Sequence, residues 1–545
     1  MSLEDSYSNC IAQYMEAGET QESLENTFRC FANTNIEMEE SNQSLHKVLF
    51  IIFCSSLVFL MQAGFAMVCS GCVRKKNVQN TILKNFIDVL GSSIAFFFVG
   101  YSFAFGGDPE KTSFIGTTNF LLSEMDYNAL GVDYAHWLFQ FAFAATAATI
   151  VAGTLAERCQ MRTYLMYSML LTGFVYPVIV HNIWSPSGFL SISNQNPLFG
   201  VGMIDFAGSG VVHVTGGITA LIATYMLGPR KGRFYDERGV KLETPEAFPG
   251  HSKSLQMLGT LLLWFGWFGF NAGSAVSVDA DSNMNPVIIA KATVNTTLSA
   301  STSGIVALLF HLFLIERQTG EPVYKLSAAM NGALTGLASI TGSCGFVEPW
   351  AAIVIGAISG LIYLGSERLL EILCLDDAVD AIPVHLCGGM WGVLAVGLFS
   401  SPRGLKNYFG DDDFNHYGWF YAWGQGSGDF TLMSCQLVGL LCILAWTALI
   451  MVPFFFTLYY FGMLRSDGLE ELVGLDVSYH GYSNFQPSQG VSAQSLRKHY
   501  DLSENFNVEE LQQYHKKRQS ETARMQRKTQ SMEYEPDYDN TDRFE

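Results

Sequence analysis

The chain is 545 residues long, and 49% of its residues are hydrophobic whereas only 15% are charged. Together with a positive mean hydropathy of +0.21, these proportions exclude an ordinary soluble globular protein and indicate a polytopic membrane protein. The net charge of −19 gives no indication of nucleic acid as a partner.

The chain opens with an acidic arm, residues 1–46, that we expect to lie outside the cell. The arm carries nine carboxylates and a single Lys or Arg, Arg29. Its start is polar, so we expect no cleavable signal peptide, and the apolar run that begins near Val48 serves as the insertion signal. Cys10 and Cys30 lie in this arm, where an oxidising compartment allows a disulfide within or between subunits, or two free thiols.

Eleven apolar segments follow, each near or above the length of about 20 residues that a transmembrane helix needs. We therefore predict an all-α polytopic membrane protein, with eleven transmembrane helices in a membrane domain that covers residues 47–465. The segments are 48–71, 82–105, 133–155, 163–184, 204–227, 254–273, 286–314, 326–343, 348–366, 381–400 and 432–464.

Basic residues favour the cytoplasmic ends of membrane helices, and here they alternate from loop to loop. The loops after the first, third, fifth and seventh segments are basic, for example Arg74, Lys75 and Lys76 after the first. By contrast, residues 185–203 and 274–285 contain no Lys or Arg. This alternation places the N-terminus outside and the C-terminus inside, as an odd number of spans requires.

Two segments, the fifth and the tenth, repeat one local pattern around a histidine. His213 and His385 follow Asp205 and Asp377 by eight residues each, and both begin the pattern His-x-x-Gly-Gly. The copies lie 172 residues and five spans apart, so the two halves must be inverted relative to each other. We predict a 5+5 inverted repeat plus a last helix, with a site near the membrane midplane where the halves meet.

A histidine inside a membrane span is energetically costly and is therefore a candidate functional residue. The simpler alternative is a hydrogen bond to a neighbouring helix. We keep that alternative for His136, His181 and His311, which have no matched partner. For the matched pair, His213 and His385, the pattern favours a built site.

Aromatic residues accompany the histidines in two segments, at 139–143 and 264–270, and Trp184 ends another. Aromatic faces attract cations, and Trp does so most strongly, by about 2 kcal/mol when desolvated. A path lined by aromatic rings that leads to neutral imidazoles suits a small cation that loses a proton on the way. The alternative is ordinary packing, which we favour for Trp264 and Trp267.

Three aspartates lie beside the histidine segments. We expect Asp205 to cap the fifth helix and to shape the site electrostatically, and Asp377 and Asp380 to play the capping role in the other half. Cys69 and Cys72 form a C-x-x-C without a second pair, whereas a zinc site needs four ligands. We therefore expect no metal and no other cofactor. The histidines have no accompanying nucleophile–base set, so we do not expect an enzyme.

Five stretches of the sequence also carry a family resemblance. They are Phe-Gln-Phe-Ala-Phe-Ala-Ala-Thr-Ala-Ala-Thr-Ile-Val-Ala-Gly from Phe139, Ala-Glu-Arg from Ala156, Asp-Phe-Ala-Gly-Ser-Gly-Val-Val-His from Asp205, Gly-Trp-Phe-Gly-Phe-Asn-Ala-Gly-Ser from Gly266 and Asp-Asp-Ala-Val-Asp-Ala-Ile-Pro-Val-His from Asp376. These motifs resemble the ammonium transporter family, and in particular its plant and algal high-affinity branch. The resemblance spans about residues 46–485 and leaves out the arm and the distal tail.

The resemblance implies a role for individual residues. Trp184, Phe143 and Ser274 match an external site that recruits ammonium through cation–π contacts and a hydroxyl acceptor. Asp205 matches the carboxylate that supports this site.

Below that site, Phe143 and Phe270 match a stacked aromatic gate, and His213 and His385 match the twin histidines of the pore. Imidazole titrates near neutrality, at about 6.5 when unperturbed, and has two exchangeable nitrogens. Two imidazoles that share one hydrogen would form a short relay and would still present an acceptor to ammonia. Potassium cannot donate a proton, so the same pore would reject it.

Residues 466–545 are expected to form a cytoplasmic regulatory tail whose distal part is disordered. Residues 475–481 resemble the family's tail motif that couples neighbouring subunits, so Gly474, Asp476 and Ser478 are candidate regulatory residues. Ser478 stands where plant relatives have a phosphorylatable threonine and keeps the hydroxyl. A kinase is therefore a candidate partner.

The residues and the resemblance together predict a high-affinity ammonium transporter, a homotrimer with one pore per subunit in the plasma membrane. The protein would recruit ammonium or methylammonium, deprotonate it, and pass ammonia with net charge movement through the pore. Two alternatives are an electroneutral ammonia channel of the Rh type and an ammonium sensor that signals through its tail.

Overall fold

The computed structural model describes residues 11–12, 21–108, 110–125, 131–236, 238–277, 285–409 and 414–480. For 21–25, 27 and 36–41 it describes the backbone alone. Within these ranges the secondary structure is helical, and the only strand-like pairs are isolated bridges. The predicted disorder of the distal tail concerns residues outside the described part of the chain.

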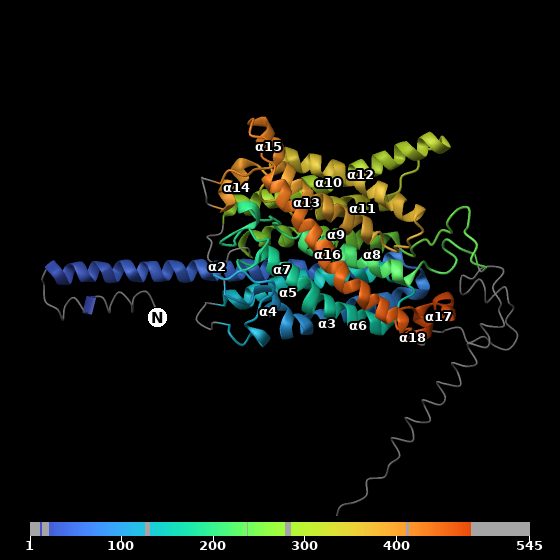
Figure 1. Ribbon diagram of the computed structural model, residues 1–545, viewed down its shortest axis with the longest axis horizontal. Helices are drawn as coiled ribbons and strands as arrows, with labels where there is room; N and C mark the ends of the chain where they lie inside the picture. Colours follow the sequence, from blue (N-terminus) through green and yellow to red (C-terminus); the bar gives the residue numbers. More distant parts are fainter. Residues whose placement is uncertain are drawn as a thin grey trace, which may run out of the picture.

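The helices run side by side along one direction of the bundle (Figure 1). Residues 204–208, 341–343 and 461–464 are not helical, but each of the eleven predicted segments lies mostly in helices. In chain order these are α2 (Gln21–Cys72), α3 (Val78–Ala95) with η2 (Phe96–Gly100) and α4 (Tyr101–Phe105), α5 (Val132–Thr154), α6 (Met161–Leu170) with η4 (Leu171–Val175) and α7 (Tyr176–Trp184), η6 (Ser209–Val214) with α8 (Thr215–Leu227), α9 (Lys253–Ser277), α10 (Pro286–Thr319), α11 (Leu326–Ile340), α12 (Pro349–Ile372), η7 (Ile382–Cys387) with α13 (Gly388–Phe399), and α16 (Thr431–Tyr460).

Shorter elements connect and extend these helices. They are η1 (Lys75–Asn77), η3 (Phe120–Leu122), η5 (Leu198–Gly200), α14 (Pro402–Phe409), α15 (Trp419–Gly424), α17 (Gly468–Val473) and α18 (Leu475–His480). Among the described residues, nine helical runs are long and apolar enough to cross a membrane. Of the eleven predicted segments, those in α9 and α11 fall outside these limits, so the protein is a multi-pass membrane protein whose count of eleven spans stays a prediction.

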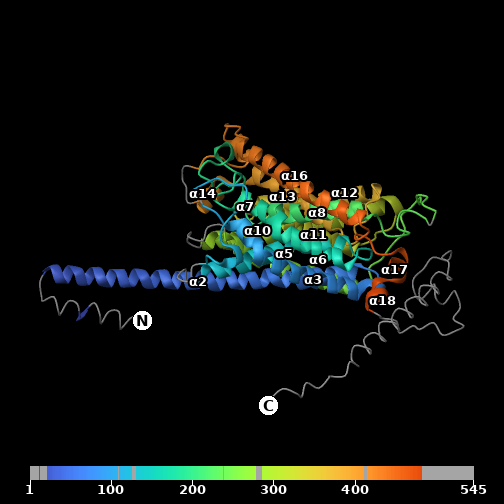
Figure 2. The same ribbon diagram turned by 60° about the horizontal axis from the view of Figure 1, so that its bottom comes forward.

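Helix α2 is a single unbroken helix of 52 residues, and its first part projects beyond all other helices (Figures 1 and 2). This projecting part belongs to the predicted N-terminal arm. The tail helices α17 and α18 lie at the opposite end of the bundle. The arm and the tail therefore lie at opposite ends, which an arrangement with the N-terminus outside and the C-terminus inside needs.

The two histidine segments cross inside the bundle. Each begins with a π-helical turn, η6 or η7, and continues as an α-helix. A Cβ atom on Gly217 would lie 2.5 Å from the amide nitrogen of Leu386, and one on Gly389 would lie 2.6 Å from the carbonyl oxygen of Ser209. The second glycine of each matched Gly-Gly pair therefore lets its helix approach the backbone of the other half.

Replacing Gly389 by alanine should destabilise the protein by about 1–3 kcal/mol, because a methyl group there overpacks the crossing against fixed backbone. Gly365→Ala is the matched control: it also lies within a membrane helix, but a Cβ there has no heavy atom within 4 Å. Thermal unfolding of the purified protein in detergent measures both. If the two variants had the same melting temperature, the crossing would not be as tight as described.

Candidate functional site

The two matched histidines meet where η6 and η7 cross. Their Nδ1 atoms are 3.2 Å apart, and the ring centroids are 5.2 Å apart with an angle of 24° between the planes. Both side chains are buried. The prediction that residues 172 apart in the chain meet at one point is thus matched by the geometry. Both histidines lie in π-helical turns, a local geometry that is frequent at functional sites.

This contact restricts the protonation of the two imidazoles. A hydrogen bond between two Nδ1 atoms needs one donor and one acceptor, so the neutral rings must be opposite tautomers. The Nε2 atom of His213 has no hydrogen-bond partner among the described residues. The pair can therefore hold one shared hydrogen and still offer a ring nitrogen to a further small molecule.

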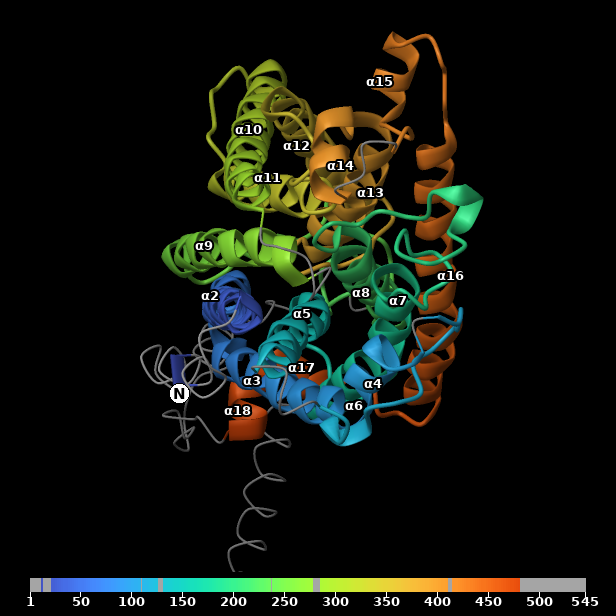
Figure 3. The same ribbon diagram turned by 90° about the vertical axis from the view of Figure 1, so that its left-hand side faces the viewer.

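Two phenylalanines stack beside the histidine pair, at the place predicted for the gate. Phe143 of α5 and Phe270 of α9 stack with centroids 3.9 Å apart and an angle of 12°. Phe270 in turn lies 5.7 Å from the ring of His213. Both phenylalanines are fully buried. The rings of Phe143, Phe270, His213 and His385 therefore form a continuous column within the bundle. Figure 3 shows the bundle end-on, with α5 beside α8.

The residues predicted to recruit ammonium lie on the far side of this stack. Trp184, the last residue of α7, meets Phe143 edge to face, with centroids 6.1 Å apart. The indole N–H of Trp184 donates to the carbonyl oxygen of Asp205 at 2.7 Å, which fixes the ring. The hydroxyl of Ser274 donates to the carbonyl of Phe270 at 2.9 Å, so its oxygen can still accept. We call Trp184, Phe143 and Ser274 the aromatic site.

Asp205 acts on this region through the backbone. Its carboxylate accepts four backbone N–H groups at 2.8–3.0 Å, and these belong to Gly208, Ser209, Gly210 and Val211. It therefore caps the first turn of η6, as predicted. Its side chain touches neither the histidines nor the gate, so its influence on the site runs through the position of η6 and through the carbonyl that holds Trp184.

In the other half, two aspartates were predicted to cap the histidine segment, but only one of them does so. Asp377 accepts the backbone N–H groups of Val379 and Ile382 at 3.1 and 2.7 Å. Asp380 was also predicted to cap, and this prediction is wrong for its side chain. Its carboxylate accepts hydrogen bonds from Asn331 and Tyr363, at 2.8 and 3.1 Å. The reason is that Asp380 has a positive φ of 60°, and its carboxylate bonds to α11 and α12 rather than to the amides of η7.

Three further aromatic residues belong to the column: Phe139 lies in a stretch expected to line the path, Trp267 was expected only to pack, and Phe65 was not assigned. Trp267 stacks on His213 at 5.1 Å and donates its indole N–H to Thr341, so its packing places it directly against the histidine pair. Phe65 lies 6.0 Å from His385, and Phe139 lies 4.6 Å from Phe143. Helical spacing gave a signal for two of them: Trp267 precedes Phe270 by three residues, and Phe139 precedes Phe143 by four. No comparable signal marked Phe65.

The predicted regulatory residues hold the tail against η1 and the start of α3. Asp476 of α18 accepts the backbone N–H groups of Gln79 and Asn80, at 3.0 and 2.7 Å. These are free amides at the start of α3, so a tail carboxylate caps a membrane helix. The ammonium group of Lys76 donates to the carbonyl of Leu472 at 2.7 Å.

Gly474 and Ser478 are also structurally constrained. Gly474 has a φ of +111°, and a Cβ there would lie 2.6 Å from the Cβ of Lys76. Glycine is therefore required both by the backbone conformation and by the close approach. The hydroxyl of Ser478 donates to the carbonyl of Gly474 at 3.2 Å, and only 7% of the residue is exposed. A phosphate on Ser478 would not fit while α18 stays docked.

A further residue anchors the tail and was not predicted. Glu471 of α17 is buried and accepts the backbone N–H of Lys231 at 2.7 Å. Its other oxygen accepts two guanidinium hydrogen bonds from Arg465, at 2.8 and 3.2 Å. Isolated acidic residues in a polar tail are common, so the sequence gave no specific signal for this contact.

Buried ion pairs continue from this anchor across the same end of the bundle. Arg230 binds Asp376 through two hydrogen bonds of 2.8 Å, and it also lies 3.5 Å from Glu157. Burial by itself raises the pKa of the Asp376 carboxyl, but Arg230 outweighs burial and holds that pKa far below its usual range. Burial likewise raises the pKa of Glu157, but Arg230 and Arg74 outweigh burial and lower that pKa. These carboxylates therefore stay charged at neutral pH and tie the loops together.

The remaining predicted features have simpler outcomes. His136 bonds to Tyr101 and Gln140, and His181 bonds to Ser113 and Ala104, so both are structural as predicted.

Cys30 is disulfide-bonded, but Cys10 lies outside the described residues, so the predicted pairing stays a prediction. Cys69 and Cys72 are free thiols.

The sequence and the fold both match known proteins. Residues 49–485 match the family model described as the Ammonium Transporter Family. Ammonium transporter 1 member 3 of Solanum lycopersicum is 40% identical over 453 residues, 82% of this chain and 94% of the relative. Ammonium transporter 3 of Dictyostelium discoideum is 40% identical over 437 residues, 80% of this chain and 93% of the relative.

Solved structures agree with these relatives. A protein described as "Sensor Amt Protein" is 31% identical, with a TM-score of 0.67, and the match covers 81% of this chain and 99% of that one. Mep2 of Candida albicans is 26% identical with a TM-score of 0.66, and the match covers 82% and 92% of the two chains. The curated relatives are named as transporters and not as enzymes. The fold is polytopic and helical, and a matched histidine pair lies beneath stacked aromatic rings. Together with these similarities, this shows that the chain belongs to the ammonium transporter family.

Proposed function

We propose that this protein is a high-affinity ammonium transporter that splits ammonium into ammonia and a proton at the His213–His385 pair. The single observation that carries the proposal is the 3.2 Å contact between the two Nδ1 atoms directly beneath the Phe143–Phe270 stack. A buried pair with one shared hydrogen can accept a proton from a bound cation and pass it from one ring to the other. An isolated structural histidine has no second ring to which it could pass the proton.

Recruitment takes place at the aromatic site, Trp184, Phe143 and Ser274. The indole and phenyl faces attract a cation by about 2 kcal/mol where water is excluded, and the Ser274 oxygen accepts one ammonium N–H. Asp205 supports the site without binding the ion, because its carboxylate is already occupied by four amides.

Passage of the intact ion beyond the gate is unfavourable. A charge in the middle of a membrane costs several kcal/mol even on lenient scales, whereas neutral ammonia avoids this cost. Deprotonation near the gate therefore lowers the barrier for ammonium but not for potassium, which has no proton to give. The histidine pair then receives ammonia through hydrogen bonds and carries the proton, so that net charge moves with each molecule.

The proposal also covers the membrane topology, the oligomeric state and the regulation of the protein. The chain crosses the plasma membrane eleven times as a 5+5 inverted repeat plus a last helix, with the N-terminus outside and the tail inside. Three copies form a homotrimer with one pore each, and a kinase acts on the tail. A purely sensory role is not favoured, because the curated relatives at 40% identity are named transporters.

Replacing both His213 and His385 by alanine should slow ammonium transport by about 100-fold and reduce the preference over potassium, because the proton acceptor is removed. His311→Ala is the matched control, since His311 lies in the membrane helix α10 and contacts neither ring. Uptake of ammonium and potassium by reconstituted vesicles measures both effects. A double variant with unchanged rate and selectivity would refute the relay.

Trp184→Leu should raise the half-saturating ammonium concentration by about 30-fold, which corresponds to about 2 kcal/mol of lost cation–π attraction. The maximal rate should change much less, because the gate and the histidines are intact. Trp423→Leu removes an indole that is 68% exposed and lies outside the column, and it should leave the concentration dependence unchanged. Equal behaviour of the two variants would contradict the recruitment site.

Ser478→Asp should abolish transport, because a carboxylate cannot be buried at this position and α18 must then leave its dock on α3. Ser478→Ala keeps the volume small and should leave transport within about twofold of the original, since the hydrogen bond lost to the Gly474 carbonyl is long, at 3.2 Å. Ammonium-induced currents, normalised to the amount of protein at the cell surface, compare the two. Normal currents in the aspartate variant would show that the tail does not control the pore.

A further inference from the structure

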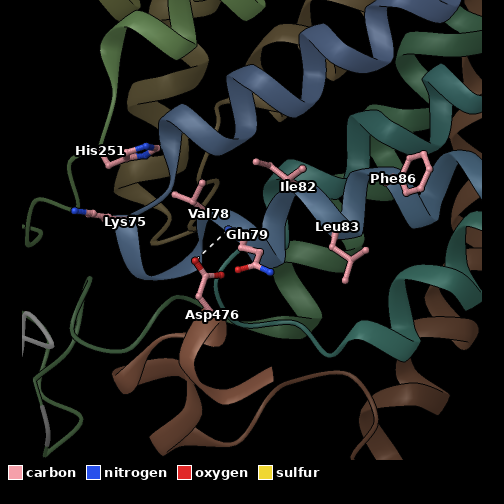
Figure 4. A pocket seen from close by; sticks show the side chains of 8 residues that line it. All are labelled: Lys75, Val78, Gln79, Ile82, Leu83, Phe86, His251 and Asp476. Carbon is pink, nitrogen blue, oxygen red and sulfur yellow. Dashed lines mark hydrogen bonds between the residues drawn. The ribbon is translucent and has the colours of Figure 1, made fainter. Parts of the chain in front are cut away.

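A groove of about 610 Å³ lies where the tail meets the start of α3, and the proposed function does not use it (Figure 4). Its lining residues are Lys75, Val78, Gln79, Ile82, Leu83, Phe86, His251 and Asp476. They come from η1, α3, the loop before α9, and α18. The groove is therefore built from the membrane body and the tail together.

The groove is polar at one end and apolar at the other. Lys75 and His251 lie close together beside the start of α3, whereas Phe86 lies furthest along the helix (Figure 4). Both Lys75 and His251 are exposed, and neither side chain has an ion-pair partner in the described part of the chain. Asp476 is the only acidic lining residue, and its carboxylate already accepts two helix amides. The polar end thus favours an anion.

The apolar end continues as a stripe along α3. Ile82, Phe86, Leu90 and Ile94 follow one another at intervals of four residues, so they share one face of the helix. Each is exposed, Phe86 by 58% and Ile94 by 50%. At 1.5 Å per residue, the stripe is about 18 Å long, close to half of a hydrocarbon core of about 30 Å. An acyl chain that enters the groove can follow this face toward the middle of the membrane.

We propose that this groove binds a phospholipid with an anionic headgroup from the leaflet on the tail side. Lys75 and His251 contact the headgroup phosphate, and one acyl chain lies along Ile82 and Phe86. A cationic end followed by an apolar stripe of half-membrane length matches such a lipid in both charge and shape. The inference depends on the proposed membrane placement, but it does not depend on ammonium transport.

The same geometry connects lipid binding to the tail. Gln79 donates its backbone N–H to Asp476, and both residues line the groove. The docked α18 therefore forms one wall, and the groove is complete only while the tail is docked. A bound lipid should stabilise the docked tail, because a ligand that binds one of two states shifts the population toward that state.

Native mass spectrometry of the full-length protein, titrated with phosphatidylserine or with phosphatidylcholine of the same acyl chains, tests the proposal. Lys75→Gln with His251→Gln should weaken phosphatidylserine binding by about fivefold or more, as expected for the loss of one cation near a headgroup. Binding of phosphatidylcholine should weaken much less, because its choline cation offsets the charge of its phosphate. Lys241→Gln is the matched control, because it removes an exposed cation from the loop between α8 and α9 without touching the groove.

Three results would overturn the assignment. One is unchanged phosphatidylserine affinity in the Lys75→Gln, His251→Gln variant, and another is an equal loss in the Lys241→Gln control. The third is a crosslink from Leu83→Cys to another subunit above the level of the unsubstituted protein. It would show that a second copy of the chain occupies the groove. Each measurement is independent of transport, so a failed lipid site and a failed ammonium transporter would give different results.

Discussion

The contact between His213 and His385 is the constraint on which the arrangement of the bundle depends. The two Nδ1 atoms lie 3.2 Å apart where the backbones of η6 and η7 cross. Gly217 and Gly389 permit this approach, each facing backbone of the opposite half. Asp205 and Asp377 then cap the two histidine segments eight residues before each ring, so that both turns start from a fixed position.

The aromatic column relates the histidine contact to the proposed transport of a cation. In the proposed mechanism, Phe143 and Phe270 keep water from the histidines, and water exclusion strengthens electrostatic interactions on both sides of the stack. Under this proposal a cation is attracted to the rim near Trp184 and opposed beyond the gate. A proton acceptor directly behind the gate resolves this conflict for an ion that can lose a proton. The ion pairs of Arg230 and Glu471 keep the opposite end of the bundle ordered.

The repeated pattern in the two halves of the sequence predicted which segments meet, whereas the local backbone conformation of those segments could not be predicted from the sequence. The apolar segments, the capping role of Asp205 and the meeting of the two histidines follow from hydrophobic length and repetition. The π-helical turns could not be predicted in this way, because no amino-acid composition distinguishes them from an α-helix. Trp267 and Phe65 were missed because an aromatic residue in a span is usually packing, and only the position of a neighbouring ring decides otherwise. Asp380 was misassigned because its positive φ redirects the carboxylate.

The central claim is that the histidine pair separates ammonium into ammonia and a proton that both cross. Simultaneous recording of current and labelled methylammonium flux, in cells that express the full-length protein, tests it most directly. The account predicts a saturable inward current with about one charge for each methylammonium taken up. Flux of the same size without current would contradict the account and would identify an electroneutral ammonia channel instead.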